Sequence, residues 1–381
     1  MSIQDSQSER KNSFDLVRLI AALAVLISHF CGMSGRPDPI DGFWGTDEDL
    51  GGLAVLIFFG LSGYLISDSI LRGASPRFYV WSRFLRIYPA LIVCLIVCII
   101  AGAFLTRLSF DQYFSSQTSQ FFFGNLFPFF WQEQRFLPGV FVPPWNAMNG
   151  PLWTIKYELA CYITALAVFL FPQSLRRFAF VVLCVLFVII WLAPIGSWQI
   201  PPASTVSSRV ARFEYFNMGF FRYYAAIFFL AATARILVGD KPIRWLLLFF
   251  SLGIIFAAFY GTPISQLALL SGLSLVGVCV GCSSLLYFNG LYKKRIGDLS
   301  YSTYLYGWPI SILCILLLAS LLGFWPTMLI AAAITLVVAC LSWKFVERPG
   351  LRLKSRIPRG APFTISPVVS GRASASAFEQ I

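Results

Sequence analysis

The side chains best suited to chemistry lie in one apolar segment, FDLVRLIAALAVLISHF, which runs from Phe14 to Phe30 and contains Arg18 and His29. His29 is the single histidine of the chain. Eleven residues at about 100° each make three helical turns plus about 20°, so a helix would place both side chains on one face. They would lie about 16 Å apart along its axis. Ionisable side chains are rare in membrane helices and usually functional, so this pair is the first candidate for a site.

Each of the two residues also has a structural interpretation. His29 could form a hydrogen bond to a neighbouring helix, and Arg18 could extend to the cytoplasmic headgroups. The functional interpretation makes His29 a general base or nucleophile, because imidazole titrates near neutral pH. Arg18 would then bind an anionic substrate. A histidine-based metal site is excluded because there is no second histidine, and we expect no metal.

Two further pairs could take part in chemistry. Arg83 and Arg86, in SPRFYVWSRFLRIYPALI, are three residues apart and would share one helix flank. Arginine forks match phosphate oxygens, although a positively charged cytoplasmic flank explains them equally well. Trp153 and Glu158, in GPLWTIKYELACY, are predicted at the outer edge of a span. Glu158 could favour the helix dipole there, or act beside His29 by orienting the imidazole or positioning a hydroxyl.

The composition requires elements that sit in a membrane. Of the 381 residues, 58% are hydrophobic and only 12% are charged, whereas soluble domains carry about 25% charged residues. We therefore predict an all-α, polytopic membrane helix bundle. About ten apolar runs have the length of a bilayer-spanning helix, near residues 14–33, 51–71, 87–106, 151–171, 177–195, 217–238, 243–260, 264–286, 299–321 and 325–346.

Loop charge predicts the orientation. Basic residues gather in alternate loops, such as the one predicted between the second and third spans with Arg72, Arg77, Arg83 and Arg86. By the positive-inside rule both termini are cytoplasmic. This clustering indicates that the net charge of +12 reflects membrane topology and not nucleic-acid binding. We expect a polar N-terminus over residues 1–13 and a transmembrane domain over 14–349. A disordered cytoplasmic tail is predicted over 350–381, where Pro, Ser, Gly and Ala are frequent after Ile357.

Six motifs in order resemble the acyltransferase-3 family of integral membrane acyltransferases. FDLVRLIAALAVLISHF resembles its Arg-x10-His first helix, and SRFLRIYP resembles its Arg-x-x-Arg motif. FFGLSGYLI, PLWTIKYE, DLSYSTYLYGWPI and FVERP resemble its remaining motifs. The chain departs from the family at Gly307, where many members have a histidine, so no second imidazole is present.

The resemblance implies transfer of an acyl group, usually acetyl, from cytoplasmic acyl-CoA to a hydroxyl of a glycan outside the cell. His29 would be the catalytic residue. Arg18, Arg83 and Arg86 would contact the phosphates of acyl-CoA (acetyl-CoA). Trp153 and Glu158 would lie on the acceptor side, with Glu158 as a second catalytic residue beside His29. The implied acceptor is a polysaccharide or lipid-linked sugar, the implied location is the bacterial cytoplasmic (inner) membrane, and membrane lipid is the surrounding partner.

A transporter or flippase of a small anion or lipid-linked sugar is the alternative function. A buried cation and an imidazole could then form a substrate and proton pathway. The chain has no evident inverted repeat, which many transporters contain. It also has no phosphate-binding Walker A motif that would couple transport to nucleotide hydrolysis.

Overall fold

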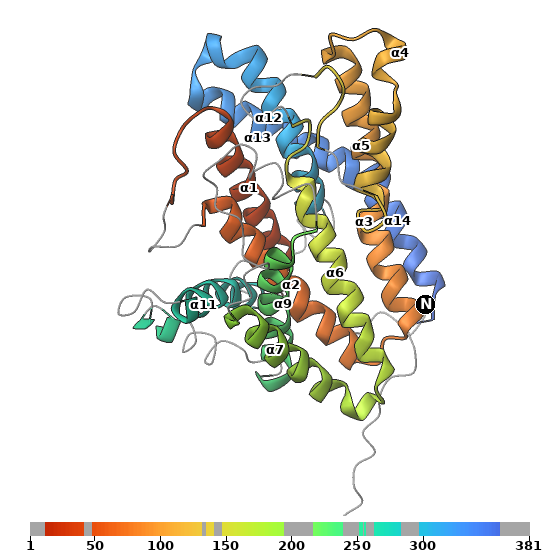
Figure 1. Cartoon of the computed structure of the whole chain (residues 1–381), viewed down its shortest axis with the longest axis vertical. Coiled ribbons are helices and arrows are strands. Elements are labelled where there is room, and N and C mark those ends of the chain that lie inside the picture. The colour runs from red at the N-terminus through yellow and green to blue at the C-terminus, as the bar shows by residue number, and fades with distance from the viewer. Residues whose placement is uncertain are drawn as a thin grey trace, which may run out of the picture.

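The fold is an all-α bundle (Figure 1). A computed structural model describes residues 12–41, 48–131, 135–140, 147–193, 216–238, 251–253, 255–256, 263–282 and 297–358. Within these ranges the regular elements are helices and turns, and no strand occurs. Nine helical segments of the described residues are long and apolar enough to cross a membrane. The predicted class, a polytopic helical membrane protein, is confirmed.

The helices follow the predicted order. The longer ones are α1 (Phe14–Met33), α2 (Leu50–Leu71), α3 (Pro76–Leu105), α5 (Ser116–Leu126), α6 (Ile155–Leu166), α7 (Arg176–Leu192), α9 (Met218–Val238), α11 (Pro263–Cys282), α12 (Ser300–Leu322) and α13 (Phe324–Ser342). Shorter elements are α4 (Phe110–Tyr113), 3-10 turns at Pro151–Thr154, Ala167–Leu170 and Gln173–Leu175, a π-helical turn at Trp343–Glu347, α14 (Arg348–Arg352) and a final 3-10 turn at Leu353–Arg356.

The third span begins earlier than predicted. We expected it near residue 87, with Arg83 and Arg86 in the preceding loop, but α3 starts at Pro76. Ser75 caps the helix by accepting a hydrogen bond from the Phe78 amide, and Pro76 occupies a position that favours helix initiation. Pro89 lies inside α3, where it removes one helical hydrogen bond without ending the helix. Both arginines are therefore held on a rigid helix.

Two other predicted segments need comment. The predicted span 243–260 lies outside the described residues except for 251–253 and 255–256, which are helical. The predicted disordered tail was placed too early, because α14 and the following 3-10 turn continue the helical structure to Arg356. These turns pack against α3, so the first part of the predicted tail, before the Pro- and Ser-rich segment, belongs to the helical bundle. Residues 359–381 lie outside the described part.

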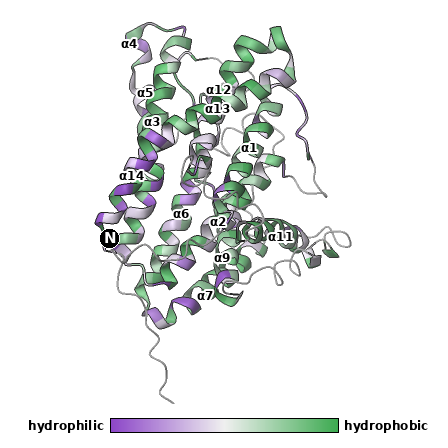
Figure 2. Cartoon of the chain, turned by 180° about the vertical axis from the view of Figure 1, so that it is seen from behind, coloured by the Kyte–Doolittle hydropathy of each residue, from purple (hydrophilic) through white to green (hydrophobic). Residues whose placement is uncertain are grey.

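Small residues bring α2 close to its neighbours. A Cβ atom on Gly63 would lie 2.0 Å from the Phe228 carbonyl oxygen of α9, and one on Gly60 would lie 2.1 Å from the Ser274 hydroxyl of α11. Such close approach is typical of helix packing in membranes. Most residues along the helices are apolar, while hydrophilic ones gather along α14 and the adjoining part of α3 (Figure 2). The site described below lies on the interior side of these helices.

Candidate active site

An open cavity lies among α1, α2, α3, α6 and α12, and the space inside it, open solvent included, is about 730 Å³. Three of the predicted arginines and the predicted carboxylate line it, together with hydroxyl-bearing, aromatic and aliphatic side chains. Its lining includes Arg18, Arg83, Arg86, Glu158, Ser62, Tyr162 and Tyr304. The structure therefore brings together predicted site residues from three distant parts of the sequence.

Two of the three arginines are paired with carboxylates of the protein. Asp298, just before α12, places Oδ2 at 2.6 Å from Arg86 and 3.5 Å from Arg18. Arg86 also lies 3.4 Å from Glu347, whose side chain is only 2% exposed. Arg18 has a further contact with Asp15 at 3.8 Å. These ion pairs join α1, α3 and the segments that flank α12 and α13.

The carboxylate of Asp298 is held in its charged form. Burial raises the pKa of Asp298, but the guanidinium groups of Arg86 and Arg18 lower it more, so the net shift is downward. Ser300 supports the charge with its amide at 3.1 Å and its hydroxyl at 2.5 Å from Oδ1. Asp298 therefore acts as a fixed counter-ion to these arginines.

Arg83 differs from the other two arginines. Within the described residues no carboxylate lies within ion-pair distance of its side chain, and its buried Nε atom has no hydrogen-bond partner. Its guanidinium carbon lies 5.6 Å from the centroid of the Tyr162 ring, in cation–π geometry. Arg83 is thus the cavity arginine whose charge is available to an incoming anion.

Glu158 lies in the first turn of α6 and faces the same cavity. The Ser62 hydroxyl donates to its Oε1 atom at 3.4 Å, and the Tyr162 hydroxyl donates to the same atom. Glu158 was predicted to act beside His29; its described contacts are with Ser62 and Tyr162, and the role beside His29 stays a prediction. Its place among the cavity arginines could not be predicted, because spacing along one helix does not reveal which neighbouring helix a side chain faces.

Hydroxyl groups also line the cavity. Tyr304 follows Ser300 by one helical turn on α12, and its hydroxyl lies 2.6 Å from the Thr154 hydroxyl. The same Tyr304 hydroxyl donates to the Pro151 carbonyl at 2.8 Å. The apolar lining includes Val55 and Ile155. The cavity thus combines cationic, anionic, hydroxyl-bearing and apolar side chains.

His29 is not among the cavity-lining residues. Its half-buried ring packs edge-on against Trp308 with centroids 4.9 Å apart. Trp308 follows Tyr304 by four residues, or about 6 Å along α12. Arg18 near Asp298 and His29 against Trp308 both make contact at the α12 side of α1, as the predicted common face requires.

Asp38, in the loop after α1, interacts electrostatically with the imidazole of His29. No described contact joins Glu158 to His29, so the predicted role of Glu158 there stays a prediction. The Oδ1 atom of Asp38 accepts hydrogen bonds from the amides of Ile40 and Leu50, each at 3.0 Å. Its Oδ2 atom is buried and has no hydrogen-bond partner among the described residues. The loop after α1 therefore presents a fixed negative charge to the outer end of that helix.

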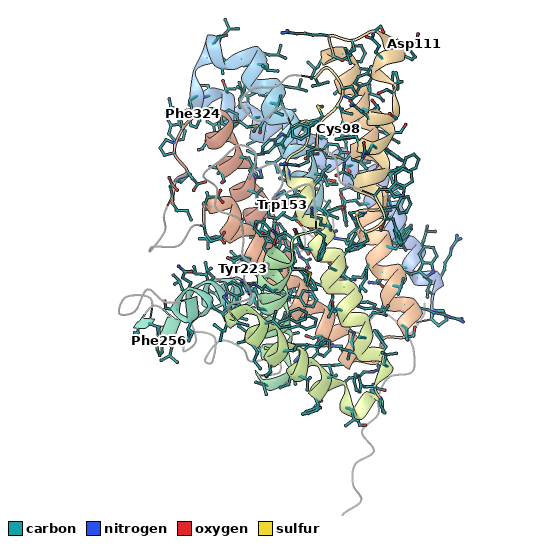
Figure 3. All side chains as sticks on the ribbon, in the orientation of Figure 1. Cys98, Asp111, Trp153, Tyr223, Phe256 and Phe324 are labelled. Atoms are coloured by element: carbon teal, nitrogen blue, oxygen red, sulfur yellow. The ribbon has the colours of Figure 1, made fainter. Side chains whose placement is uncertain are left out.

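Trp153 takes part in an aromatic cluster and does not line the cavity. Its ring lies 4.9 Å from Phe220 and 6.1 Å from Tyr224 of α9, and 5.7 Å from Tyr157 (Figure 3). The half-buried indole joins the start of α6 to α9. No contact with His29 is described for it, so its predicted role on the acceptor side remains a prediction.

Sequence reasoning missed Asp298, Glu347, Ser62 and Tyr162. Asp298 and Glu347 are the acidic residues of DLSY and FVERP, two motifs whose individual residues received no role. A buried acid at the end of an apolar run requires a partner, which is a usable signal. Within the described part, no group of three or more His, Cys, Asp or Glu side chains is placed to hold a metal ion.

The fold and the cavity together define a polytopic membrane protein with an arginine-lined cavity among its helices. Residues 11–344 match the acyltransferase domain family acyltransferase-3, and the chain belongs to this family. It is an integral membrane acyltransferase.

Two characterised relatives cover almost the whole chain. An O-acetyl transferase of Shigella phage Sf6 is 31% identical over 345 residues, which cover 89% of this chain and 96% of that protein. Nodulation protein 10 of Rhizobium leguminosarum bv. viciae is 27% identical over 380 residues, which cover 93% of this chain and 96% of that protein. No solved structure matches the chain.

Proposed function

We propose that this acyltransferase moves an acetyl group from acetyl-CoA, bound from the cytoplasmic side, to a hydroxyl of a cell-surface glycan on the outer side of the bacterial inner membrane. The observation that carries the proposal is the combination of side chains that line the cavity. Its arginines suit the phosphates of the donor, and its hydrogen-bonding groups suit the amide-bearing arm. Trp308, one helical turn after the cavity residue Tyr304 on α12, contacts His29.

The arginines have unequal roles in this proposal. Arg83 binds phosphate directly because no carboxylate competes for it in the described part of the chain. Arg18 and Arg86 contribute positive charge that Asp298 and Glu347 already partly balance. Such pairs fix the guanidinium groups before a ligand arrives, which lowers the entropy lost on binding.

His29 acts in one of two ways. As a general base, its imidazole removes the proton of the acceptor hydroxyl, and the resulting oxygen attacks the thioester carbonyl. The carbon–sulfur bond breaks, and the CoA thiolate takes up a proton. As an acyl carrier, the imidazole nitrogen attacks first, CoA leaves, and the hydroxyl then receives the acyl group. In both routes Asp38 stabilises the positive charge that forms on the ring.

The test is acetyl transfer by the purified protein in proteoliposomes. Acetyl-CoA labelled in the acetyl group is supplied on one side, with an extracted envelope glycan on the other. We expect base-labile label on the glycan that depends on the protein. A transporter would move label or glycan across the bilayer without joining them, and that result would contradict the proposal. Mass spectrometry of envelope glycans with and without the gene would identify the sugar that gains the acetyl group.

A further inference from the structure

Glu158 is a carboxylate in a cavity with three arginines, yet it is paired with none of them. Its described hydrogen bonds come from Ser62 and Tyr162, and both reach the same oxygen, Oε1. Within the described residues, no hydrogen bond or ion pair reaches Oε2. The side chain lines the cavity, so this oxygen is available to a ligand.

A carboxylate only accepts hydrogen bonds, so a ligand beside Glu158 must bring a donor. A phosphate there would be repelled, and an apolar group would remove water from the charge without replacing it. Both penalties discriminate against ligands that lack a hydroxyl or N–H at this point. Glu158 therefore selects for ligands with a hydrogen-bond donor at this point, a feature that the arginines, which are donors themselves, cannot recognise.

Tyr162 relates this carboxylate to Arg83. The guanidinium of Arg83 lies over the ring of Tyr162, and the hydroxyl of the same ring donates to Glu158. A ligand with its phosphate on Arg83 thus places the adjoining part of the molecule at Glu158. In acyl-CoA held at Arg83 by its diphosphate with the acyl end directed toward His29, that part is the pantetheine arm, which carries one hydroxyl and two amide N–H groups.

We propose that Glu158 is a specificity-determining residue that accepts a hydrogen bond from the hydroxyl or an amide N–H of the donor's pantetheine arm. This inference rests on the proposed function, since it assumes that the cavity binds acyl-CoA. It replaces the role beside His29 that the sequence suggested for this carboxylate. Glu158 thereby distinguishes acyl-CoA from nucleotides that offer similar phosphates but no such arm.

The test compares two ligands on the purified full-length protein. Coenzyme A carries the arm, and adenosine 3′,5′-bisphosphate carries phosphates without it. Glu158→Gln should weaken coenzyme A binding by about tenfold to a hundredfold, the usual effect of losing a hydrogen bond to a charged group. Affinity for the bisphosphate should stay unchanged or rise. Glu158→Asp keeps the charge but shortens the side chain, and should lose the same preference. Asp111→Asn on α4 is the matched control and should change neither affinity.

A second measurement needs no variant of the protein. Coenzyme A analogues with N-methylated amides, or without the arm's hydroxyl, remove one donor at a time from the ligand. We expect one of them to bind the wild-type chain about as weakly as coenzyme A binds Glu158→Gln. Equal losses for both ligands in Glu158→Gln, or full affinity for all analogues, would overturn the inference while leaving the proposed function intact. If the wild-type protein binds no coenzyme A, the proposed function fails and the inference fails with it.

Discussion

Arg83 and Arg86, three residues apart on one helix, should respond differently to the same substitution. Arg86→Ala leaves two buried carboxylates, Asp298 and Glu347, without their closest cationic partner. Removing one member of a buried ion pair costs about 3–5 kcal/mol. Arg83→Ala strands no described carboxylate, so its effect on stability should be limited to about 0.5–1 kcal/mol from the lost cation–π contact with Tyr162.

The order reverses for donor binding. Arg83→Ala removes a charge-assisted contact to phosphate, worth about 1.5–3 kcal/mol, or about tenfold to a hundredfold in affinity. Arg86→Ala, where it still folds, should lose less affinity, because Arg86 is already engaged by two carboxylates. Thermal unfolding in detergent and titration with coenzyme A measure the two effects on the same samples. Arg107→Ala, at an exposed position, is the control. Equal melting temperatures for the Arg83 and Arg86 variants would refute the reasoning.

Three further perturbations follow from individual contacts. Burial raises the pKa of Asp298, but Arg86, Arg18 and the hydrogen bonds from Ser300 together lower it below the usual 3.8. The Asp298 carboxylate therefore contributes its full stability above pH 3.8, and this contribution is lost as the pH falls through the lower folded-state pKa. Asp298→Asn should reduce the melting temperature at neutral pH and flatten its decline in acid, and an unchanged profile would contradict the ion-pair account. Gly63→Ala should destabilise the bundle by about 1–3 kcal/mol in detergent unfolding, because a Cβ atom would meet the α9 backbone, whereas Gly32→Ala, with nothing within 4 Å, should not. Asp38→Asn should slow acetyl transfer with little change in coenzyme A affinity, since Asp38 acts on His29 and not on the cavity; an equal loss of affinity would argue against this.

The sequence was informative where apolar runs were long and uninterrupted. The first span was predicted at residues 14–33, and α1 occupies Phe14–Met33. The third was misplaced because Arg83, Arg86 and Pro89 are typical of a loop or a helix start. Inside the bundle, however, the cavity and its carboxylates accommodate both arginines. We interpreted the charge of these arginines as a sign of exposure, but both of them line the cavity.

The partners of the site residues could not be predicted from spacing. Asp298 and Glu347 lie more than two hundred residues after Arg86, so only the folded bundle brings them together. For Glu158, helical periodicity is consistent with Tyr162 on the same face, but it could not show that this face contacts α2 and α3. Gly307, where a second histidine was absent, packs against Leu26 of α1, so His29 is the imidazole on which the proposed chemistry depends.

The most direct test of the account is the acetyl-transfer rate of His29→Ala in proteoliposomes, with coenzyme A affinity measured on the same preparation. Because His29 lies outside the cavity lining, donor affinity should be unchanged. The transfer rate should fall by a factor of about 10²–10⁴, the usual contribution of a positioned base. Transfer at the wild-type rate by a protein without imidazole would contradict the central claim that acyl chemistry takes place at His29.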